Sequence, residues 1–289
     1  MMSNLNEFSN PPKCELIDIQ LDDAILTISL NREKVFNALN PQLIGELTEI
    51  LKWSSDNSVA KKESLVDSNG TKYLRVIILK GAGKHFCAGA DINWMRDSGA
   101  QSIEENTEDA NRLDQLFYNL WAHPCFTLSL VHGVALGGGA GLIACVDQVV
   151  AIEGAKIAMS EIKLGILPAV IGPYVYRKTG SAQFRRLAML GSRIDANEAQ
   201  MIGLVNNIAK SESEAEEIIQ NIVTQILSSA PNGVLKAKQL SLALDRWNES
   251  DEMLRKYTVE LTSNMRGSLE GQEGLSSFLE RRNPEWNPE

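Results

Sequence analysis

The sequence has few histidines, cysteines and aromatic residues, and it has no excess of positive charge. Its 289 residues include three histidines and four cysteines, and neither set has the spacing of a metal site. A net charge of −9 argues against nucleic acid or an anionic membrane surface as the main partner. No apolar run is long enough to span a bilayer, and residues 1–12 lack the pattern of a secretory signal. We therefore expect a cytoplasmic protein with reduced thiols, no metal and no redox cofactor.

The hydrophobic content, 44%, is sufficient for a large core. Apolar and β-branched runs alternate with segments of helical periodicity as far as residue 210, and the rest of the chain is helical in pattern. This predicts an α/β core over residues 13–210 and an all-α region over 211–289. The predicted strands are 14–20, 24–30, 74–80, 126–131, 148–152 and 204–208, and the predicted helices are 41–54, 108–121, 171–178, 182–190 and 196–202. Residues 55–72 and 98–107 are polar and predict surface loops.

Two glycine-rich stretches follow apolar strands and are the strongest candidates for a functional site. The first is Gly81 to Asp91, and the second is His132 to Asp147, which passes from a strand through Gly137–Gly139 into an apolar helical segment. Glycine lets the main chain approach a ligand closely, and the N–H groups at a helix start have no partner within the helix. The two loops are expected to converge on one carbonyl oxygen. Taken alone, the glycines at 137–139 are equally explained by close packing of a helix on a sheet.

Four landmarks in this order resemble the crotonase family, the enoyl-CoA hydratase/isomerase superfamily. They are Leu30–Arg32 with Asn37–Leu39, Phe86–Asp91, Gly133–Gly139 and Ala196–Val205. The resemblance covers most of the chain and implies a spiral of ββα units with a C-terminal all-α trimerisation region. It also implies a homo-oligomer, either a trimer or a dimer of trimers, that acts on an acyl-CoA thioester. Coenzyme A would then be part of the substrate, with no separate cofactor.

The resemblance also assigns the reacting groups. The backbone N–H groups of Ala90 and Gly138 match the family's oxyanion hole, which stabilises the negative charge that develops on the thioester oxygen. Glu161 matches a catalytic glutamate of the family, and burial in an apolar pocket would raise the pKa of its carboxyl group. Without the resemblance, Glu161 after Ser160 would be explained as an ordinary acid at a helix N-terminus.

Gly141 is the main departure from the family pattern, because two-glutamate hydratases carry their first catalytic glutamate there. Three segments, Ala90–Met95, Gly137–Leu142 and Glu161–Tyr174, carry a finer resemblance. It is to the bacterial methylglutaconyl-CoA hydratase-like branch, which also lacks this acid, and it favours hydration of a short branched or carboxylated enoyl-CoA. The candidate substrate is 3-methylglutaconyl-CoA, an intermediate of leucine breakdown. Two alternatives stay open: a Δ3-Δ2-enoyl-CoA isomerase that uses Glu161 alone, and a non-catalytic acyl-CoA-binding subunit.

Contacts to the substrate are expected at three kinds of position. Cations for the CoA phosphates are expected from the two N-terminal loops and from the C-terminal helix of a neighbouring subunit, and small or apolar residues of the glycine loops are expected to line the acyl group. Each cation taken alone is better explained as a solvated surface charge. The residues are Arg32, Lys34, Lys84 and Arg281 for the phosphates, and Ala88, Asp91, Ile92 and Gly137 around the thioester.

Overall fold

A six-stranded sheet is the centre of the fold. The computed structural model describes residues 7–62 and 64–287, and the strand order of this sheet is β1-β2-β3-β4-β6-β9. β1 and β2 form an antiparallel hairpin, and every other neighbouring pair in the sheet is parallel. The strands are β1 (Ile17–Asp22), β2 (Ile25–Leu30), β3 (Val76–Gly81), β4 (Phe126–Val131), β6 (Gln148–Ile152) and β9 (Asn207–Ala209).

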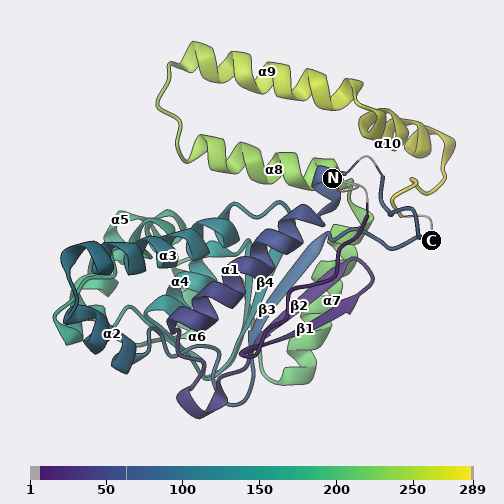
Figure 1. Cartoon of the computed structure of the whole chain (residues 1–289). Helices are drawn as coiled ribbons and strands as arrows, with labels where there is room; N and C mark the ends of the chain where they lie inside the picture. The colour runs from purple at the N-terminus through teal and green to yellow at the C-terminus, as the bar shows by residue number, and fades with distance from the viewer. Residues whose placement is uncertain (1–6, 63, 288–289) are drawn as a thin grey trace.

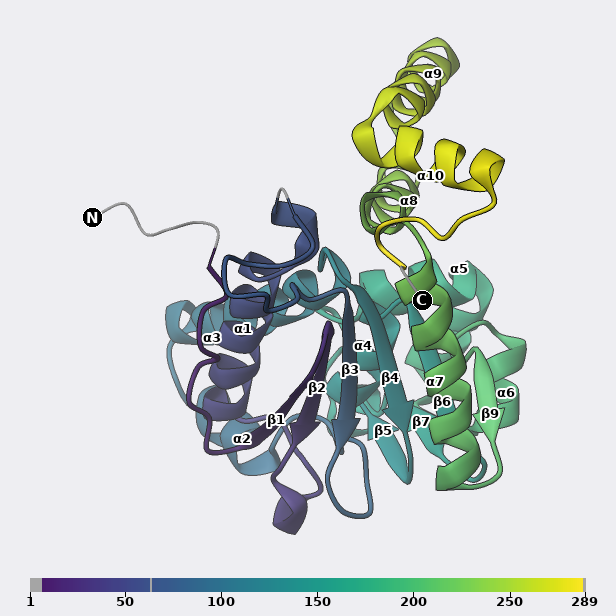
Figure 2. The ribbon, with the colours of Figure 1, turned by 90° about the vertical axis from the view of Figure 1, so that its right-hand side faces the viewer.

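Helices cover both faces of this sheet, which explains why its inner strands are almost continuously apolar. On one face, Leu26, Ile77 and Val149 belong to a core that also includes α1 and α4. On the other face, Val76, Leu128 and Val150 pack against α7. Figures 1 and 2 show α7 on one side of the strands and α1 and α3 on the other. The helices of these layers are α1 (Pro41–Asp56), α3 (Ile103–Trp121), α4 (Gly138–Cys145) and α7 (Glu212–Ser228).

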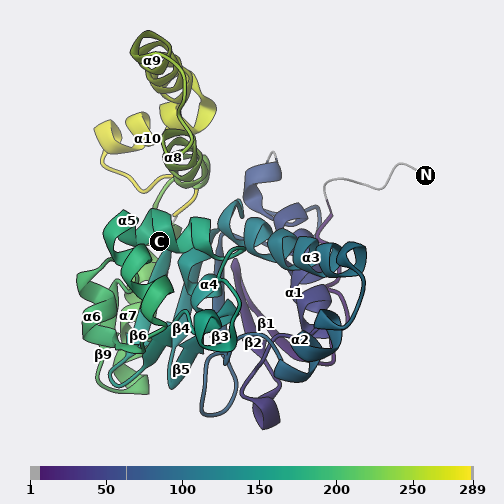
Figure 3. The same cartoon turned by 90° about the vertical axis from the view of Figure 1, so that its left-hand side faces the viewer.

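A second, three-stranded sheet lies beside the first and carries the site loops. Its order is β5-β7-β8, with β5 parallel to β7 and β7 antiparallel to β8. Helices α2, α5 and α6 and three short 3-10 helices complete the core (Figure 3). These elements are β5 (Val134–Leu136), β7 (Lys156–Ala158), β8 (Ile194–Asp195), η1 (Glu33–Val35), η2 (Val59–Lys61), η3 (Glu161–Leu164), α2 (Ile92–Gly99), α5 (Gly172–Leu190) and α6 (Ala196–Met201).

Three local predictions differ from the structure. Residues 98–107 are not a loop: α2 continues to Gly99, and α3 begins at Ile103 because Ser102 and Glu105 form a capping box. By contrast, the two helices predicted at 171–178 and 182–190 are both present as the two halves of α5, which is kinked by non-helical backbone angles at Gly180 (φ 74°). The strand predicted at 204–208 is shorter and later, at Asn207–Ala209, and the predicted loop 55–72 includes the end of α1 and η2.

The C-terminal helices form an arm that stands above the core in Figure 1. Its members are α8 (Pro231–Leu244), α9 (Asp251–Gly267) and α10 (Leu269–Glu280). Two cations fix its base. Arg75 donates to the carbonyls of Ile226, Leu227 and Ser229 at the end of α7, and Lys238 of α8 forms a 2.6 Å ion pair with Asp147.

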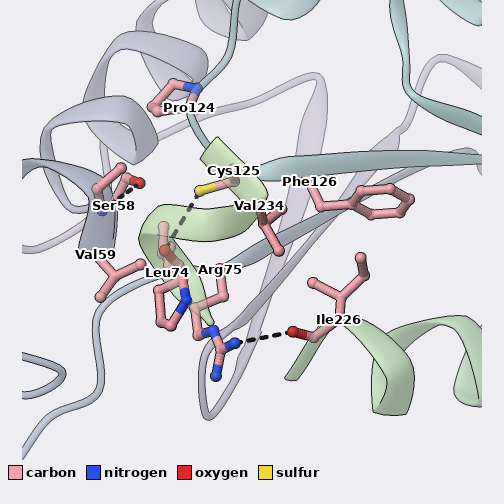
Figure 4. A pocket seen from close by; sticks show the side chains of 11 residues that line it. Ser58, Val59, Leu74, Arg75, Pro124, Cys125, Phe126, Ile226 and Val234 are labelled. Atoms are coloured by element: carbon pink, nitrogen blue, oxygen red, sulfur yellow. Dashed lines mark hydrogen bonds between the residues drawn. The ribbon is translucent and has the colours of Figure 1, made fainter. Parts of the chain in front are cut away.

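A small hollow at this junction, shown in Figure 4, is lined by Arg75, Cys125 and Ile226, among others. Its volume is about 10 Å³, which is space for no more than one water molecule. The hollow is therefore a packing defect and cannot hold a substrate. The predicted region 211–289 thus begins with α7, which packs on the sheet, and only α8–α10 project as an arm; residues 288–289 lie outside the described ranges.

Candidate active site

The two glycine-rich loops run side by side. The N–H of Cys87 donates to Val134 O at 3.0 Å, and the N–H of Leu136 donates to Cys87 O at 3.0 Å. At Gly89 the backbone has φ 93°, and a Cβ atom would lie 2.8 Å from Leu136 O. Only glycine fits this position without displacing the main chain. The expected convergence of the loops is therefore present, and it brings residues 87–90 next to residues 135–138.

Two backbone N–H groups point out of the local hydrogen-bond pattern at this junction. Gly138 is the first residue of α4, and the preceding residue, Gly137, donates its own N–H to Ala158 O at 2.8 Å. Ala90 lies between Gly89, whose carbonyl accepts from Leu39, and Asp91, whose N–H donates to the Leu39 carbonyl. Among the residues that the structure describes, neither the Ala90 nor the Gly138 N–H has a protein acceptor. Both residues line the same cavity.

This cavity has a volume of about 270 Å³ and an apolar lining. Of the predicted site residues, it brings together Ala88, Ala90, Ile92, Gly137, Gly138 and Glu161. The sequence did not predict most of the remaining cavity wall. That part of the wall comes from α2, α3, the end of η3 and the segment between η3 and α5. Those residues are Trp94, Met95, Leu113, Leu164, Ile166, Leu167, Pro168, Ala169, Val170 and Ile171. Residues 166–171 lie between η3 and α5, so no helical periodicity marks them.

Glu161 is the only acidic residue among the described residues that line the cavity. It is the first residue of η3, and its Oε1 lies 3.1 Å from the point that a Cβ atom of Gly137 would occupy. Its Oε2 is buried and has no hydrogen-bond partner among the described residues. Burial raises the pKa of this carboxyl group above its usual value. A buried carboxyl group with a raised pKa is suited to accept a proton and release it again.

The position of Gly141 is filled by neighbouring side chains. A Cβ atom there would lie 2.3 Å from Cγ2 of Ile171 and 2.9 Å from Cε1 of Phe117. Gly141 is buried in α4 and does not line the cavity. The structure thus provides neither a carboxylate nor space for one at this position. Ile171 instead presents its side chain to both Gly141 and the cavity.

Adding a carboxylate at this position tests the filled space. Gly141→Glu is expected to lower the free energy of unfolding by about 1–3 kcal/mol, because overpacking forces its neighbours to move. Combining it with Ile171→Ala should restore part of that loss by vacating the space. Urea denaturation measures both changes. Gly45→Glu is the matched control, because nothing lies within 4 Å of a Cβ atom at that exposed position of α1, and equal destabilisation by both substitutions would contradict the packing described here.

Arg32 and Asp91 contact each other. Arg32 Nη2 lies 3.2 Å from Asp91 Oδ2, and Nη1 donates to the carbonyl of Ala38. Asp91 also caps α2 by accepting from the N–H of Asn93 at 3.0 Å. The guanidinium predicted to bind a CoA phosphate therefore has partners inside the protein. The Arg32–Asp91 pair joins the segment that precedes α1 to the residue that follows Ala90.

The other predicted cations lie at the surface. Lys34 and Lys84 are exposed on adjacent loops, since the Glu33 carboxyl group lies 2.5 Å from the position of a Cβ atom on Gly83. Neither lysine forms an ion pair within the described ranges. Arg281 follows α10 on the arm, which Figure 1 shows far from α2 at the cavity side of the molecule. One chain therefore does not bring Arg281 to the cavity.

No group of three His, Cys, Asp or Glu side chains in residues 7–62 and 64–287 is arranged to hold a metal ion. In the same ranges, no helix combines the length and apolarity needed to cross a membrane.

Comparison with known proteins identifies the family. The family model described as enoyl-CoA hydratase/isomerase matches residues 20–289. An enoyl-CoA hydratase structure from Shewanella pealeana superposes with a TM-score of 0.85 at 33% identity, covering 95% of this chain and 97% of the other. An enoyl-CoA hydratase/isomerase structure from Marinobacter aquaeolei superposes with a TM-score of 0.83 at 29% identity, covering 94% of this chain and 99% of the other. The mevalonyl-coenzyme A hydratase SIDH of Beauveria bassiana is 27% identical, covering 96% of each chain.

These similarities agree with the architecture. The α/β class and the crotonase fold predicted from the four landmarks are confirmed by the sheet arrangement and by the solved relatives. The family model covers the core, both glycine-rich loops, Glu161 and the C-terminal helices. The chain belongs to the enoyl-CoA hydratase/isomerase family, the crotonase superfamily.

Proposed function

We propose that this protein hydrates 2-enoyl-CoA thioesters, with Glu161 as its single acid/base group and the N–H groups of Ala90 and Gly138 as its oxyanion hole. The observation that carries the proposal is the position of the Glu161 carboxyl group. It is buried, its Oε2 has no partner among the described residues, and it shares one apolar cavity with both unpaired N–H donors. An acid far from these donors could not serve the carbon next to the thioester carbonyl.

The proposed reaction uses one water molecule and one carboxylate. The thioester oxygen accepts hydrogen bonds from Ala90 and Gly138, which draws electron density away from C3. The water oxygen bonds to C3 while Glu161 accepts a water proton, and the C2–C3 π electrons move to give an enolate. Glu161 then returns that proton to C2, and the C2–H bond forms as the carbonyl is restored. Two fixed N–H donors stabilise the enolate oxygen, each typically by about 3–4 kcal/mol in the transition state.

The cavity lining bears on the acyl group. It contains no lysine, arginine or histidine, so a distal carboxylate would enter an apolar wall without a counter-charge from the described residues. Burying an unpaired carboxylate is strongly unfavourable. Of the two acyl classes that the sequence resemblance suggested, the lining therefore supports an uncharged branched chain over the carboxylated 3-methylglutaconyl group of leucine breakdown.

An isomerase is the second candidate. Moving the double bond from C3–C4 to C2–C3 requires one base that removes a proton from C2 and returns it to C4. The cavity contains one carboxylate beside the oxyanion donors. The absence of space for a second carboxylate at Gly141 favours neither reaction over the other. A non-catalytic acyl-CoA-binding subunit is the third reading, and it gives no reason for a buried carboxyl group without a partner.

The C-terminal arm supports a proposed homo-oligomer. Its helices expose large apolar side chains: Val259 is 67% exposed, Leu269 92% and Phe278 81%. These residues would be covered by neighbouring copies in a trimer or a dimer of trimers, and such packing could bring Arg281 to the CoA of another subunit. Lys34 and Lys84 are the proposed phosphate contacts within one chain.

A panel of thioesters tests the function. Crotonyl-CoA and 3-methylhex-2-enoyl-CoA are expected to lose their conjugated absorbance with the addition of one water, which mass spectrometry detects as 18 Da. We expect 3-methylglutaconyl-CoA, a carboxylated analogue of similar length, to react at least tenfold more slowly in kcat/KM. Formation of conjugated product from 3-hexenoyl-CoA without hydration of any 2-enoyl compound would replace the hydratase with the isomerase. No reaction with any of these thioesters would favour the non-catalytic acyl-CoA-binding subunit.

A further inference from the structure

The helix that supplies one oxyanion donor has few interactions of its own to hold it in place. α4 is eight residues long, all of them buried, and three are glycines. Glycine weakens a helix interior by about 1 kcal/mol relative to alanine. Its N-cap, Gly137, offers no side-chain hydrogen bond. The position of the Gly138 N–H therefore depends on what contacts the rest of α4.

The opposite end of α4 contacts a lysine. Lys178, in the first half of α5, donates from Nζ to the carbonyl of Ile143 at 3.0 Å. This carbonyl belongs to the last turn of α4, where no N–H of the helix itself is available. A cation at a helix C-terminus also interacts favourably with the helix dipole.

No anion neutralises Lys178 directly. The two groups whose negative charge would favour its charged form are Asp147 and Cys145. The Asp147 carboxylate is already bound by Lys238 at 2.6 Å and accepts from the N–H of Thr127. Burial raises the pKa of the Cys145 thiol far above its usual value, so this side chain is neutral. Within the described ranges Lys178 forms no ion pair with a carboxylate.

An unneutralised, largely buried ammonium group is unfavourable for folding. Burial accordingly lowers the pKa of Lys178 to about 8. A methionine or leucine at this position would fill the same space without that penalty. For stability, the hydrogen bond to the Ile143 carbonyl and the helix dipole favour the lysine, and the burial of its charge opposes it.

We propose that Lys178 is a positioning residue for the reaction: it holds the C-terminal end of α4, and its charge supports the negative charge that forms on the thioester oxygen at the N-terminal end. This inference rests on the proposed function. The two ends of an eight-residue helix are about 12 Å apart. Because α4 is buried, solvent screens this interaction little. At an effective dielectric constant of about 20, two unit charges at that separation change a rate about tenfold.

The test compares Lys178→Met with Arg185→Met, which removes an exposed cation from the same helix. In Lys178→Met we expect kcat for crotonyl-CoA to fall about tenfold and KM to change less than twofold. The melting temperature should change little, because loss of the hydrogen bond to Ile143 and relief of the buried charge oppose each other. The wild-type kcat should also decline as pH rises through about 8, where Lys178 loses its charge, and the variant should lack this decline. Arg185→Met should match the wild type in all four measurements.

Two results would overturn the inference. One is a Lys178→Met enzyme with wild-type kcat and an unchanged alkaline limb. The other is a loss of activity that is accompanied by a lower melting temperature and that leaves the pH profile unchanged, which would indicate a purely structural role. If the proposed function is wrong, the wild type will hydrate none of the thioesters, which distinguishes that failure from failure of the Lys178 inference. The variants are then compared by the rate of proton exchange at C2 of butyryl-CoA.

Discussion

Glu161→Gln is expected to lower kcat for crotonyl-CoA by about 10²–10⁴-fold, the usual contribution of a general acid–base group. Glutamine has nearly the same shape but cannot accept a proton from water. KM should change little, because the substitution leaves the apolar lining and both N–H donors in place. The spectrophotometric hydration assay measures the effect, and Glu153→Gln, an exposed acid at the end of β6, is the matched control. Less than a threefold loss in Glu161→Gln would contradict the assignment of Glu161.

The same substitution has a predicted signature in stability. The pKa of Glu161 is raised in the folded protein, so the folded state binds its proton more tightly than the unfolded chain does. The stability from this group is complete below the unfolded pKa, about 4.3, and is lost as pH rises through the folded value. Glutamine cannot ionise, so the variant lacks this loss of stability with rising pH. We expect Glu161→Gln to be at least as stable as the wild type at pH 7 in thermal denaturation, and a marked loss of stability would show that Glu161 has a structural partner.

Gly138→Pro is expected to lower kcat by about 10²–10³-fold relative to Gly138→Ala, the range for loss of one oxyanion donor. Proline removes the N–H, and the first position of a helix is where proline is best tolerated. Alanine keeps the N–H and introduces the same Cβ atom, which would lie 2.7 Å from Cδ1 of Leu39 in both variants. The two variants therefore share the Cβ contact and differ at the nitrogen, where the N–H of alanine is replaced by the ring Cδ of proline.

Circular dichroism and binding of CoA provide the controls for this pair. Both variants should fold and bind CoA alike, because the substitution lies in the thioester part of the site. Equal kcat in Gly138→Pro and Gly138→Ala would show that this N–H group does not stabilise the transition state.

The sequence was sufficient to predict the architecture where local signals and packing agree. Asn40 and Pro41 mark the start of α1, and the structure shows the Asn40 side chain accepting from the N–H of Leu43. The inner strands β4 and β6 were predicted at their observed bounds because both faces of the sheet are covered. The start of α3 was missed although Ser102 and Glu105 form a capping box, because the polar run around them suggested a loop.

The site was predictable to a different extent. Glycine-rich loops after apolar strands predicted the convergence that brings Ala90 and Gly138 to one cavity. The contact of Ile171 with Gly141 could not be predicted, because it joins α4 to the residue that precedes α5 and leaves no local pattern. Residue type alone does not show that the Arg32 guanidinium contacts Asp91 and the Ala38 carbonyl. The contact of Arg32 with a CoA phosphate stays a prediction.

Proton exchange at C2 of butyryl-CoA in D2O is the most direct test of the central claim. This saturated thioester can neither be hydrated nor isomerised, so exchange reports only on removal and return of the C2 proton beside a stabilised carbonyl oxygen. The account predicts that the wild type incorporates deuterium at C2, detected by mass spectrometry, and that Glu161→Gln and Gly138→Pro each reduce the rate by at least about a hundredfold. Exchange at the wild-type rate in Glu161→Gln would contradict it.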